Sequence, residues 1–299
     1  MSTPEHKSYY GRPILKEPVW KPEVAWYLFT GGLSGALSGL GFAARLSGNE
    51  VLARRALTLA GTVAAANPVL LVTDLGRPLR FLNMLRVFKV TSPMSVGSWI
   101  LMVSGSASSA AALLEATGRL KPVKYLAELV AALSGGPLSV YTATLVSDTA
   151  VPVWHEARHE LPFLFGSSAL ASAGAASAMV VAPGEAGPAR RLAVGGAIAE
   201  NVVMQAMEKR LGMLAEPYHE GEAGKYAKLA KTCSLGCAAL LGLGGRRSRA
   251  AAVAGGALLL AGEAALRWSV FKAGFQSARD PKYTVIPQRE RAQSGESSR

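Results

Sequence analysis

Five long segments of the chain contain no Lys, Arg, Asp or Glu, and this pattern limits the fold more than any other feature. About 20 apolar residues let a helix cross the hydrocarbon core of a bilayer. Only 17% of the residues are charged, whereas soluble domains typically carry about 25%. The sequence therefore predicts a polytopic membrane protein. The five segments are 18 to 25 residues long and cover residues 24–44, 56–73, 90–114, 129–147 and 161–184.

Three further apolar segments, near 191–211, 229–245 and 250–274, are interrupted by a few charges. A chain in lipid must satisfy its backbone groups internally, as helices or a closed barrel, and no alternating strand pattern is present. We therefore expect an all-α fold with eight transmembrane helices in two four-helix halves. The expected helices cover residues 24–46, 52–74, 94–117, 122–147, 161–183, 190–212, 226–246 and 249–275.

The polar segments define the expected organisation. Eight crossings place both termini on one side, which we call the terminal face, together with loops 74–93, 148–160 and 212–226. The opposite loops are short and basic, but the terminal face has more Lys and Arg in total, so the positive-inside rule leaves the orientation open. The net charge of +12 fits anionic lipid headgroups and is not interpreted as nucleic-acid binding. The expected units are a polar segment 1–23 without a signal peptide, a first half 24–147, a loop 148–160, a second half 161–275 and a tail 276–299.

Residues 70–95, "LLVTDLGRPLRFLNMLRVFKVTSPMS", concentrate polar residues between two apolar runs. Pro78 suits the first turn of a helix, and the apolar residues that follow it fall on one helical face. This pattern favours an amphipathic interfacial helix over residues 78–89, and an ordinary surface loop is the alternative. Asp74 and Arg77 are expected to pair, which lowers the cost of both charges near the hydrocarbon.

Other polar groups are expected at the same membrane depth on the terminal face. Carboxylates and a tyrosine hydroxyl there suit an amphipathic ligand with a polar head, which they can hydrogen-bond and exchange protons with. An ordinary belt of interfacial aromatic residues is the alternative. The candidate ligand-binding residues are Glu23, Trp26, Tyr27, Asp74, Arg77, Tyr141 and Asp148.

Ionisable residues also occur inside the second half. Glu200 and Glu208 lie in the same expected helix, where Asn201, Gln205 and Glu208 share one face, and Glu263 and Arg267 are separated by four residues. Buried charges in a membrane are costly unless they are paired. Glu263 and Arg267 therefore either neutralise each other or, together with Glu200 and Glu208, form a proton path.

Glycines recur every fourth residue in "GGLSGALSGLG", at Gly31, Gly35 and Gly39. This spacing is typical of a helix face that lets a neighbouring helix approach closely. We interpret it as a packing surface.

The sequence offers little for a resident metal. "HEARH" at 155–159 has the spacing of a zinc-protease helix, but Pro152 and Pro162 restrict any helix to a turn or two, and no third ligand follows. Cys233 and Cys237 are too few for an iron–sulfur cluster. The four histidines fall in expected loops or the amino-terminal tail, so neither haem nor an iron–sulfur cluster is expected on this chain.

Several motifs resemble the polysulfide reductase membrane-anchor family of the NrfD/PsrC type. The resemblance begins at "YLFTGGLSGALSG", is most specific in "DLGRPLRFLNMLRVFKVTSPMSVGSW", and continues through "YTATLVSDTAVPVW" and "LPFLFGSSALASAGA" to "ALRWSVFKAGFQSARDPKYTV". Tyr141 matches the tyrosine of the family's Tyr-Thr motif. Ala143 stands where the family commonly has glycine, and the first helix lacks the histidine that some members place beside the quinone. Glu23 is the candidate substitute.

The resemblance implies a quinone-reactive subunit that binds menaquinone or another quinone and has no catalytic centre of its own. Its implied partners are a ferredoxin-like iron–sulfur subunit with four clusters and a molybdopterin subunit, with molybdenum or tungsten, that performs for example polysulfide, thiosulfate or formate chemistry. The implied location is the cytoplasmic membrane of a prokaryote. A proton-translocating module and a stand-alone transporter remain alternatives. The residues expected to dock the iron–sulfur partner are Arg80, Arg86, Tyr283 and Arg289.

Overall fold

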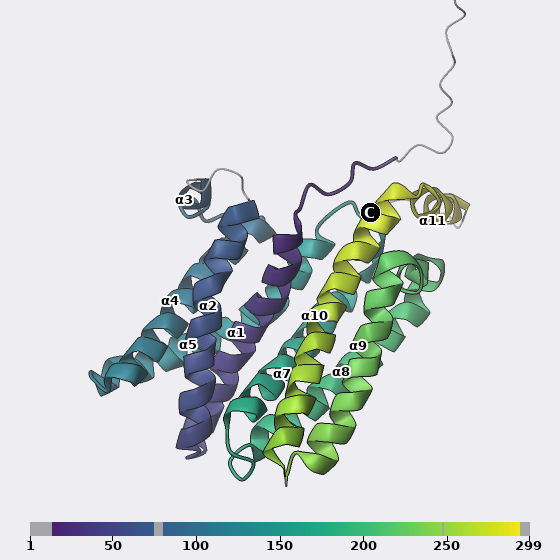
Figure 1. The fold of residues 1–299 in the computed structure, drawn as a ribbon. Helices are drawn as coiled ribbons and strands as arrows, with labels where there is room; N and C mark the ends of the chain where they lie inside the picture. Colours follow the sequence, from purple (N-terminus) through teal and green to yellow (C-terminus); the bar gives the residue numbers. More distant parts are fainter. Residues whose placement is uncertain (1–13, 75–79, 247, 294–299) are drawn as a thin grey trace, which may run out of the picture.

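The computed structural model describes residues 14–74, 80–246 and 248–293, and these residues form a helical fold. Eight long helices lie side by side in the described part of the chain (Figure 1). They are α1 (Pro22–Leu46), α2 (Glu50–Asp74), α4 (Pro93–Thr117), α5 (Lys121–Ser147), α7 (Leu161–Val180), α8 (Gly187–Leu211), α9 (Gly221–Ala239) and α10 (Arg249–Arg279). The shorter helices are α3 (Arg80–Met84), α6 (Pro152–Glu156), η1 (Ala157–His159), η2 (Gly212–Tyr218), η3 (Leu240–Gly244) and α11 (Lys282–Gln293).

Helices α2, α4, α5, α7 and α10 are long and apolar enough to cross a membrane, by length and composition. Their apolar side chains point outward as well as inward. In α2, for example, only 33% of the most apolar 18-residue stretch is buried inside the fold. Such exposed apolar helix faces suit a lipid surrounding. Helices α1, α8 and α9, which have 25, 25 and 19 residues, are not among these five. The all-α class is confirmed for the described residues, and eight crossings stay a prediction.

The helices begin where the local sequence favours a first turn. Proline occupies the first or second position of α1, α4, α5, α7 and α8, where its missing N–H costs nothing. The Ser92 side chain caps α4 by accepting from the Ser95 N–H. Gly118 ends α4 with a φ of 65°, a left-handed conformation that glycine adopts easily.

The helices contact one another in two groups. Helices α1, α2, α4 and α5 pack together, and α7, α8, α9 and α10 form the second group. Helix α1 also contacts α7 and α10 across the boundary. The described start of α1 and helix α11 lie at the same end of the bundle (Figure 1), which is the terminal face.

Only one of the three spaced glycines is required for a close helix approach. A Cβ on Gly35 would overlap the carbonyl oxygen of Gly135 in α5, whereas a Cβ on Gly39 would meet nothing within 4 Å. A Cβ on Gly31 would make ordinary contacts with Tyr27 and Thr142 at 3.6 and 3.9 Å. The close contact between α1 and α5 therefore depends on Gly35.

We expect Gly35→Ala to lower the free energy of unfolding by about 1–3 kcal/mol, because added volume in a tight contact forces the backbones apart. The matched control is Gly39→Ala, which should stabilise the same helix by up to ~1 kcal/mol. Denaturation of both variants in detergent measures the difference. Equal stability of the two variants would contradict the close contact of α1 with α5.

The interfacial helix is shorter than the expected residues 78–89. Helix α3 ends at Met84, and residues 78–79 lie outside the described residues. After Met84, the Ser95 hydroxyl donates to the Val87 carbonyl at 2.9 Å and accepts from the Lys89 N–H at 3.0 Å. These bonds accompany a non-helical path at residues 87–89, where the last expected turns of the helix would lie.

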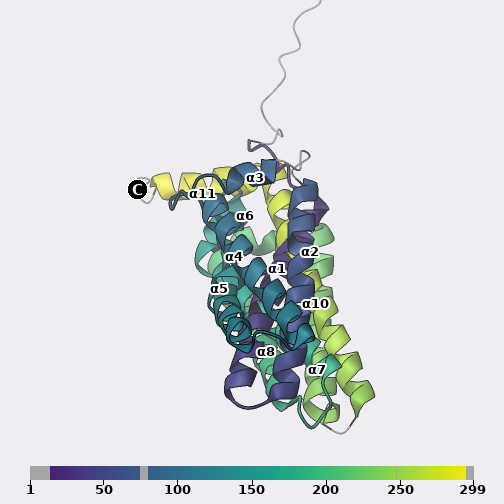
Figure 2. The same cartoon turned by 90° about the vertical axis from the view of Figure 1, so that its left-hand side faces the viewer.

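The described part of the tail, residues 276–293, is largely helical. Helix α10 continues to Arg279, and α11 then runs across the terminal face (Figure 2). Lys282 and the Tyr283 hydroxyl both donate to Glu216 Oε2, at 2.7 and 3.2 Å. These contacts fix α11 to η2.

Acid is expected to release α11. The hydrogen bond from Lys282 holds the pKa of the Glu216 carboxyl below the ordinary value of a glutamate, about 4.5. Because the folded pKa is lowered, this contact stabilises the docked helix above pH 4.5 and is lost as the pH falls through the lower folded pKa. Hydrogen exchange of the α11 amides, corrected for intrinsic rates, should show this loss of protection. Glu216→Gln should weaken protection already at neutral pH, and the exposed Glu220→Gln should not.

Candidate functional site

A small cavity of about 50 Å³ opens among α1, α2, α4 and α5 near the terminal face. It contains polar groups on an otherwise apolar wall. The apolar residues Tyr27, Leu101, Leu138 and Tyr141 also form one buried cluster beside it. The cavity is lined by Trp20, Val24, Tyr27, Leu71, Asp74, Met84, Met94, Gly97, Ser98, Tyr141 and Leu145.

Tyr27 and Tyr141 bring two hydroxyl groups to this cavity. The side chains are 2% and 9% exposed, yet neither hydroxyl bonds to a residue that the structure describes. A buried tyrosine hydroxyl usually finds a partner. Both hydroxyls are therefore free to bind a polar group inside the cavity.

Asp74 lies at the end of α2 and lines the same cavity. Its Oδ1 accepts a hydrogen bond from the backbone N–H of Lys21 at 3.0 Å, directly before α1. This bond satisfies an N–H at the start of a helix and ties α1 to α2. Arg77, the expected partner, lies outside the described residues.

Gly97 leaves the space that the Tyr141 ring occupies, because a Cβ at this position would overlap the ring. The neighbouring Ser98 hydroxyl donates to the Met94 carbonyl at 2.8 Å and to the Met84 sulfur at 3.7 Å. Methionine side chains are flexible and adapt to irregular spaces. The wall formed by Met84 and Met94 is therefore the adaptable side of the cavity.

The structure brings Tyr27, Asp74 and Tyr141 together but places other candidates elsewhere. Glu23 lies one turn before Tyr27 on the same helix face, and its Oε2 is buried without a partner among the described residues. The Trp26 ring is 44% exposed and meets Trp268 edge-on at 6.0 Å, outside the cavity.

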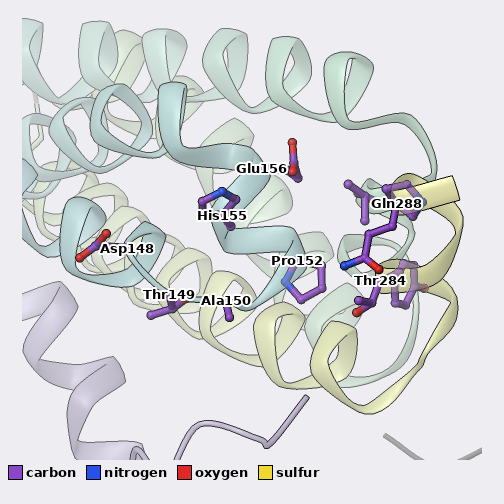
Figure 3. Close-up of a pocket in the computed structure, with 11 residues that line it drawn as sticks. Asp148, Thr149, Ala150, Pro152, His155, Glu156, Thr284 and Gln288 are labelled. Carbon is purple, nitrogen blue, oxygen red and sulfur yellow. The ribbon is translucent and has the colours of Figure 1, made fainter. Parts of the chain in front are cut away.

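Asp148 is exposed and lines a separate groove of about 490 Å³ between α6 and α11. Figure 3 shows Asp148 at one end of this groove and Thr284 and Gln288 at the other, with His155 between them. His155 belongs to the five-residue α6, and His159 to η1. The "HEARH" segment is thus not one continuous α-helix.

A second polar centre lies between the two groups of helices. Arg267 is 1% exposed and forms no ion pair within 4 Å of a described carboxylate, which corrects the expected pairing with Glu263. Its Nε donates to the Leu28 carbonyl at 3.2 Å, and Nη2 donates to the Phe165 carbonyl at 2.9 Å. The guanidinium also lies 3.8 Å from the centre of the Phe165 ring. Arg267 therefore links α10 to α1 and α7.

Glu263 and Glu200 lie near this arginine, and the two carboxyl groups are close enough to interact electrostatically. Glu263 Oε2 accepts a hydrogen bond from Ser168 at 2.5 Å. Glu263 Oε1 and Glu200 Oε2 are both buried without a partner in the described part of the chain. Burial of two neighbouring carboxyl groups is costly when both carry a charge.

A cavity of about 270 Å³ leads from Glu200 toward the terminal face and is lined by Glu208, Tyr218 and His219. The His219 Nε2 lies 3.8 Å from a Glu208 carboxylate oxygen. Three of the four proposed proton-path residues therefore surround one buried centre, and the fourth lines its access cavity. Ser168 was not predicted, since a serine in a small-residue helix carries no distinctive signal.

An ionic cluster at the opposite face was also not predicted. Arg45 of α1 binds Glu115 of α4 at 2.7 Å and Glu128 of α5 at 2.8 Å, and also pairs with Glu50. Lys124 lies 2.9 Å from Glu115. The four-residue spacing of Lys124 and Glu128 could have suggested a local ion pair. It could not have indicated Arg45, which lies 70 and 83 residues from Glu115 and Glu128 in the chain.

Among the expected docking residues, Arg80, Arg86 and Arg289 are exposed. Tyr283 is only 2% exposed, and its hydroxyl donates a hydrogen bond to Glu216. It fixes α11 and does not belong to an exposed docking surface.

The fold and the cavities define a multi-pass helical membrane protein with a mostly apolar cavity that contains polar groups near one interface. The family described as polysulphide reductase, NrfD, matches residues 14–194, more than half of the 299 residues, and the chain belongs to this family. Membership indicates a membrane-anchor subunit of oxidoreductase complexes that interacts with quinone. The match ends within α8, so the motifs noted near the carboxyl terminus lie beyond it. No curated protein matches the chain.

Proposed function

We propose that the chain is the quinone-reactive anchor of a respiratory oxidoreductase in a prokaryotic cytoplasmic membrane, with eight helices crossing the bilayer. Tyr27, Asp74 and Tyr141 bind the quinone head group. The observation that carries the proposal is that two buried tyrosines, Tyr27 and Tyr141, line one cavity and that neither hydroxyl has a partner among the described residues.

The cavity residues fit an amphipathic ring with a polar edge. The volume of about 50 Å³ is enough for a water molecule and is below that of typical ligand pockets, about 300–1,000 Å³. Entry of a head group therefore requires Met84 and Met94 to move. Leu71 and Leu145 supply the apolar wall for the substituents of the ring.

Menaquinone or another quinone, when bound, exchanges two electrons and two protons with its surroundings. Tyr27 and Tyr141 donate hydrogen bonds to the head group. The carboxylate of Asp74 is only half-buried at the terminal face, so it exchanges protons with water there. Glu23, one turn before Tyr27, holds a second proton position.

The terminal face is proposed to receive the electron-transfer partner. Arg80, Arg86 and Arg289 are exposed there, and basic side chains steer an acidic protein surface into contact. The proposed partner is a ferredoxin-like iron–sulfur subunit with four clusters, connected to a molybdopterin subunit that holds molybdenum or tungsten. The family typically works with subunits of these two kinds.

Purification of the chain in mild detergent, followed by metal, sulfide and quinone analysis, tests the proposal. We expect iron, sulfide, molybdenum or tungsten and bound quinone in the same complex. Mass spectrometry of the large partner then identifies the substrate. A chain that purifies without metals or quinone and transports a solute on its own would instead support the transporter alternative.

A proton path through Glu200, Glu208, Glu263 and Arg267 is the second proposed function. It is favoured by the access cavity that reaches Glu200 from the terminal face and by the two unpartnered buried carboxyl oxygens. On the other side of this centre the described core is closed by buried apolar residues such as Ala193 and Leu259. A proton held by the carboxyl pair is thus accessible from one face in this conformation.

We expect Glu263→Gln to abolish proton translocation coupled to quinone turnover, because an amide cannot release the proton that the carboxyl pair shares. Quinone turnover itself should change by less than about threefold, since this residue does not line the quinone cavity. Proteoliposomes with the intact complex and an internal pH dye measure both quantities. The exposed Glu185→Gln is the control, and translocation at the wild-type level in Glu263→Gln would contradict the path.

A further inference from the structure

A basic cavity of about 470 Å³ lies where α8 begins and η3 ends. The first turns of α8 lie at the end of the bundle opposite the terminal face (Figure 1). Three guanidinium groups line it, from Arg190 and Arg191 of α8 and from Arg246 directly after η3. The rest of the wall is apolar or glycine. Such a combination of charge and apolar surface is typical of a site for an anionic amphiphile.

No described carboxylate neutralises these three arginines. The charged groups that act on Arg190 are Arg191 and Arg246, and both repel it. Arg190 is held in place by the carbonyl oxygens of Pro183 and Gly245, at 2.6 and 3.3 Å. Like charges held together without a counter-charge favour binding of an anion between them.

The first helical group provides an internal comparison at the same membrane face. There, the carboxylate of Glu115 pairs with three basic residues, Arg45, Arg54 and Lys124. That cluster is neutralised by the protein itself. Arg190, Arg191 and Arg246 lie at the same face of the bundle, but none of them pairs with a carboxylate among the described residues.

An apolar strip continues from the arginines toward the membrane centre. Val194, Ile198 and Val202 follow one another at four-residue spacing on α8, and Ile198 and Val202 are 60% and 61% exposed. A Cβ on Gly195 would meet nothing within 4 Å, so the groove beside this strip is open. Its length and direction suit an acyl chain that lies along the helix.

We propose that this cavity is a binding site for an anionic phospholipid, with its phosphodiester between Arg191 and Arg246 and an acyl chain along α8. The site is separate from the quinone reaction. Arg190 serves to shape the cavity through its two backbone contacts. A free phosphate ion shares the head-group chemistry but lacks the acyl chain.

Native mass spectrometry of the full chain, in detergent with equal amounts of phosphatidylglycerol and phosphatidylcholine, tests the site. We expect retention of one phosphatidylglycerol. Each arginine at a lipid surface is worth about fivefold in binding, so Arg191→Gln with Arg246→Gln should weaken retention about 30-fold. Arg190 is left unchanged, because its backbone contacts make it a structural residue.

The matched control is Arg55→Gln with Arg119→Gln, which removes two exposed charges from the same face of the first helical group. This control should retain the lipid as the unaltered chain does. Gly195→Phe, which fills the groove without a change in charge, should also weaken retention. Equal retention of the two lipids, or lipid retention unaffected by the Arg191 and Arg246 changes, would overturn the site. Displacement of the lipid by excess inorganic phosphate would instead assign the cavity to a free anion and overturn the lipid proposal.

Discussion

Gly97→Ala is expected to reduce quinone-dependent electron transfer by about a hundredfold. The added Cβ would overlap the Tyr141 ring, so the ring must move into the cavity that the head group needs. A displacement of a positioning group by about 1 Å can cost a hundredfold in rate. Turnover of the purified complex with a soluble quinone measures the effect.

The matched control lies two turns along the same helix. A Cβ on Gly105 would meet nothing within 4 Å, so Gly105→Ala should leave turnover unchanged and favour the helix by up to ~1 kcal/mol. Tyr141→Phe separates the hydroxyl from the ring and should lower turnover at least tenfold, as expected for the loss of a group that donates a proton or hydrogen bond. Wild-type turnover in Gly97→Ala would contradict the proposed site.

Arg267→Met is expected to lower the free energy of unfolding by about 3–5 kcal/mol. The change leaves Glu200 and Glu263 without a nearby positive charge and removes the donors to the Leu28 and Phe165 carbonyls. Removal of one member of a buried charged group is strongly destabilising for this reason. Denaturation of the purified chain in detergent measures the loss.

Lys272→Met on the same helix is the control. Lys272 pairs with Glu222 at 2.7 Å, but the two side chains are 35% and 69% exposed, and such surface pairs contribute less than about 1 kcal/mol. Adding Glu263→Gln to Arg267→Met should recover part of the stability, because it removes one of the unpaired charges. Equal losses in Arg267→Met and Lys272→Met would contradict the linking role of Arg267.

The sequence predicted the helices well because long uncharged runs and flanking prolines are local signals. Every expected helix start lies within five residues of the observed one, and the largest difference occurs at α9, where Lys and Glu hide the apolar pattern. The expected length of the interfacial helix was wrong, and the helix in the tail was not predicted. Ser95 competes for the backbone after Met84, and Glu216 is the distant contact that holds α11.

Trp26 and Asp148 lie outside the cavity, but the meeting of three other candidates was predictable because alternating crossings bring helix ends to one depth. Tyr27, Asp74 and Tyr141 meet for that reason. Partners within the group were less predictable, since Asp74 binds the backbone of Lys21. Arg267 likewise binds carbonyls on two other helices. A spacing of four residues suggests a pair but carries no information about groups on neighbouring helices.

Photolabelling with an azidoquinone, followed by peptide mapping, tests the central claim most directly. The proposed site predicts label on Met84, Met94 or Tyr141, and loss of this label in Gly97→Ala but not in Gly105→Ala. Label confined to α8, α9 or α10, or label that is insensitive to Gly97→Ala, would contradict a quinone site among α1, α2, α4 and α5.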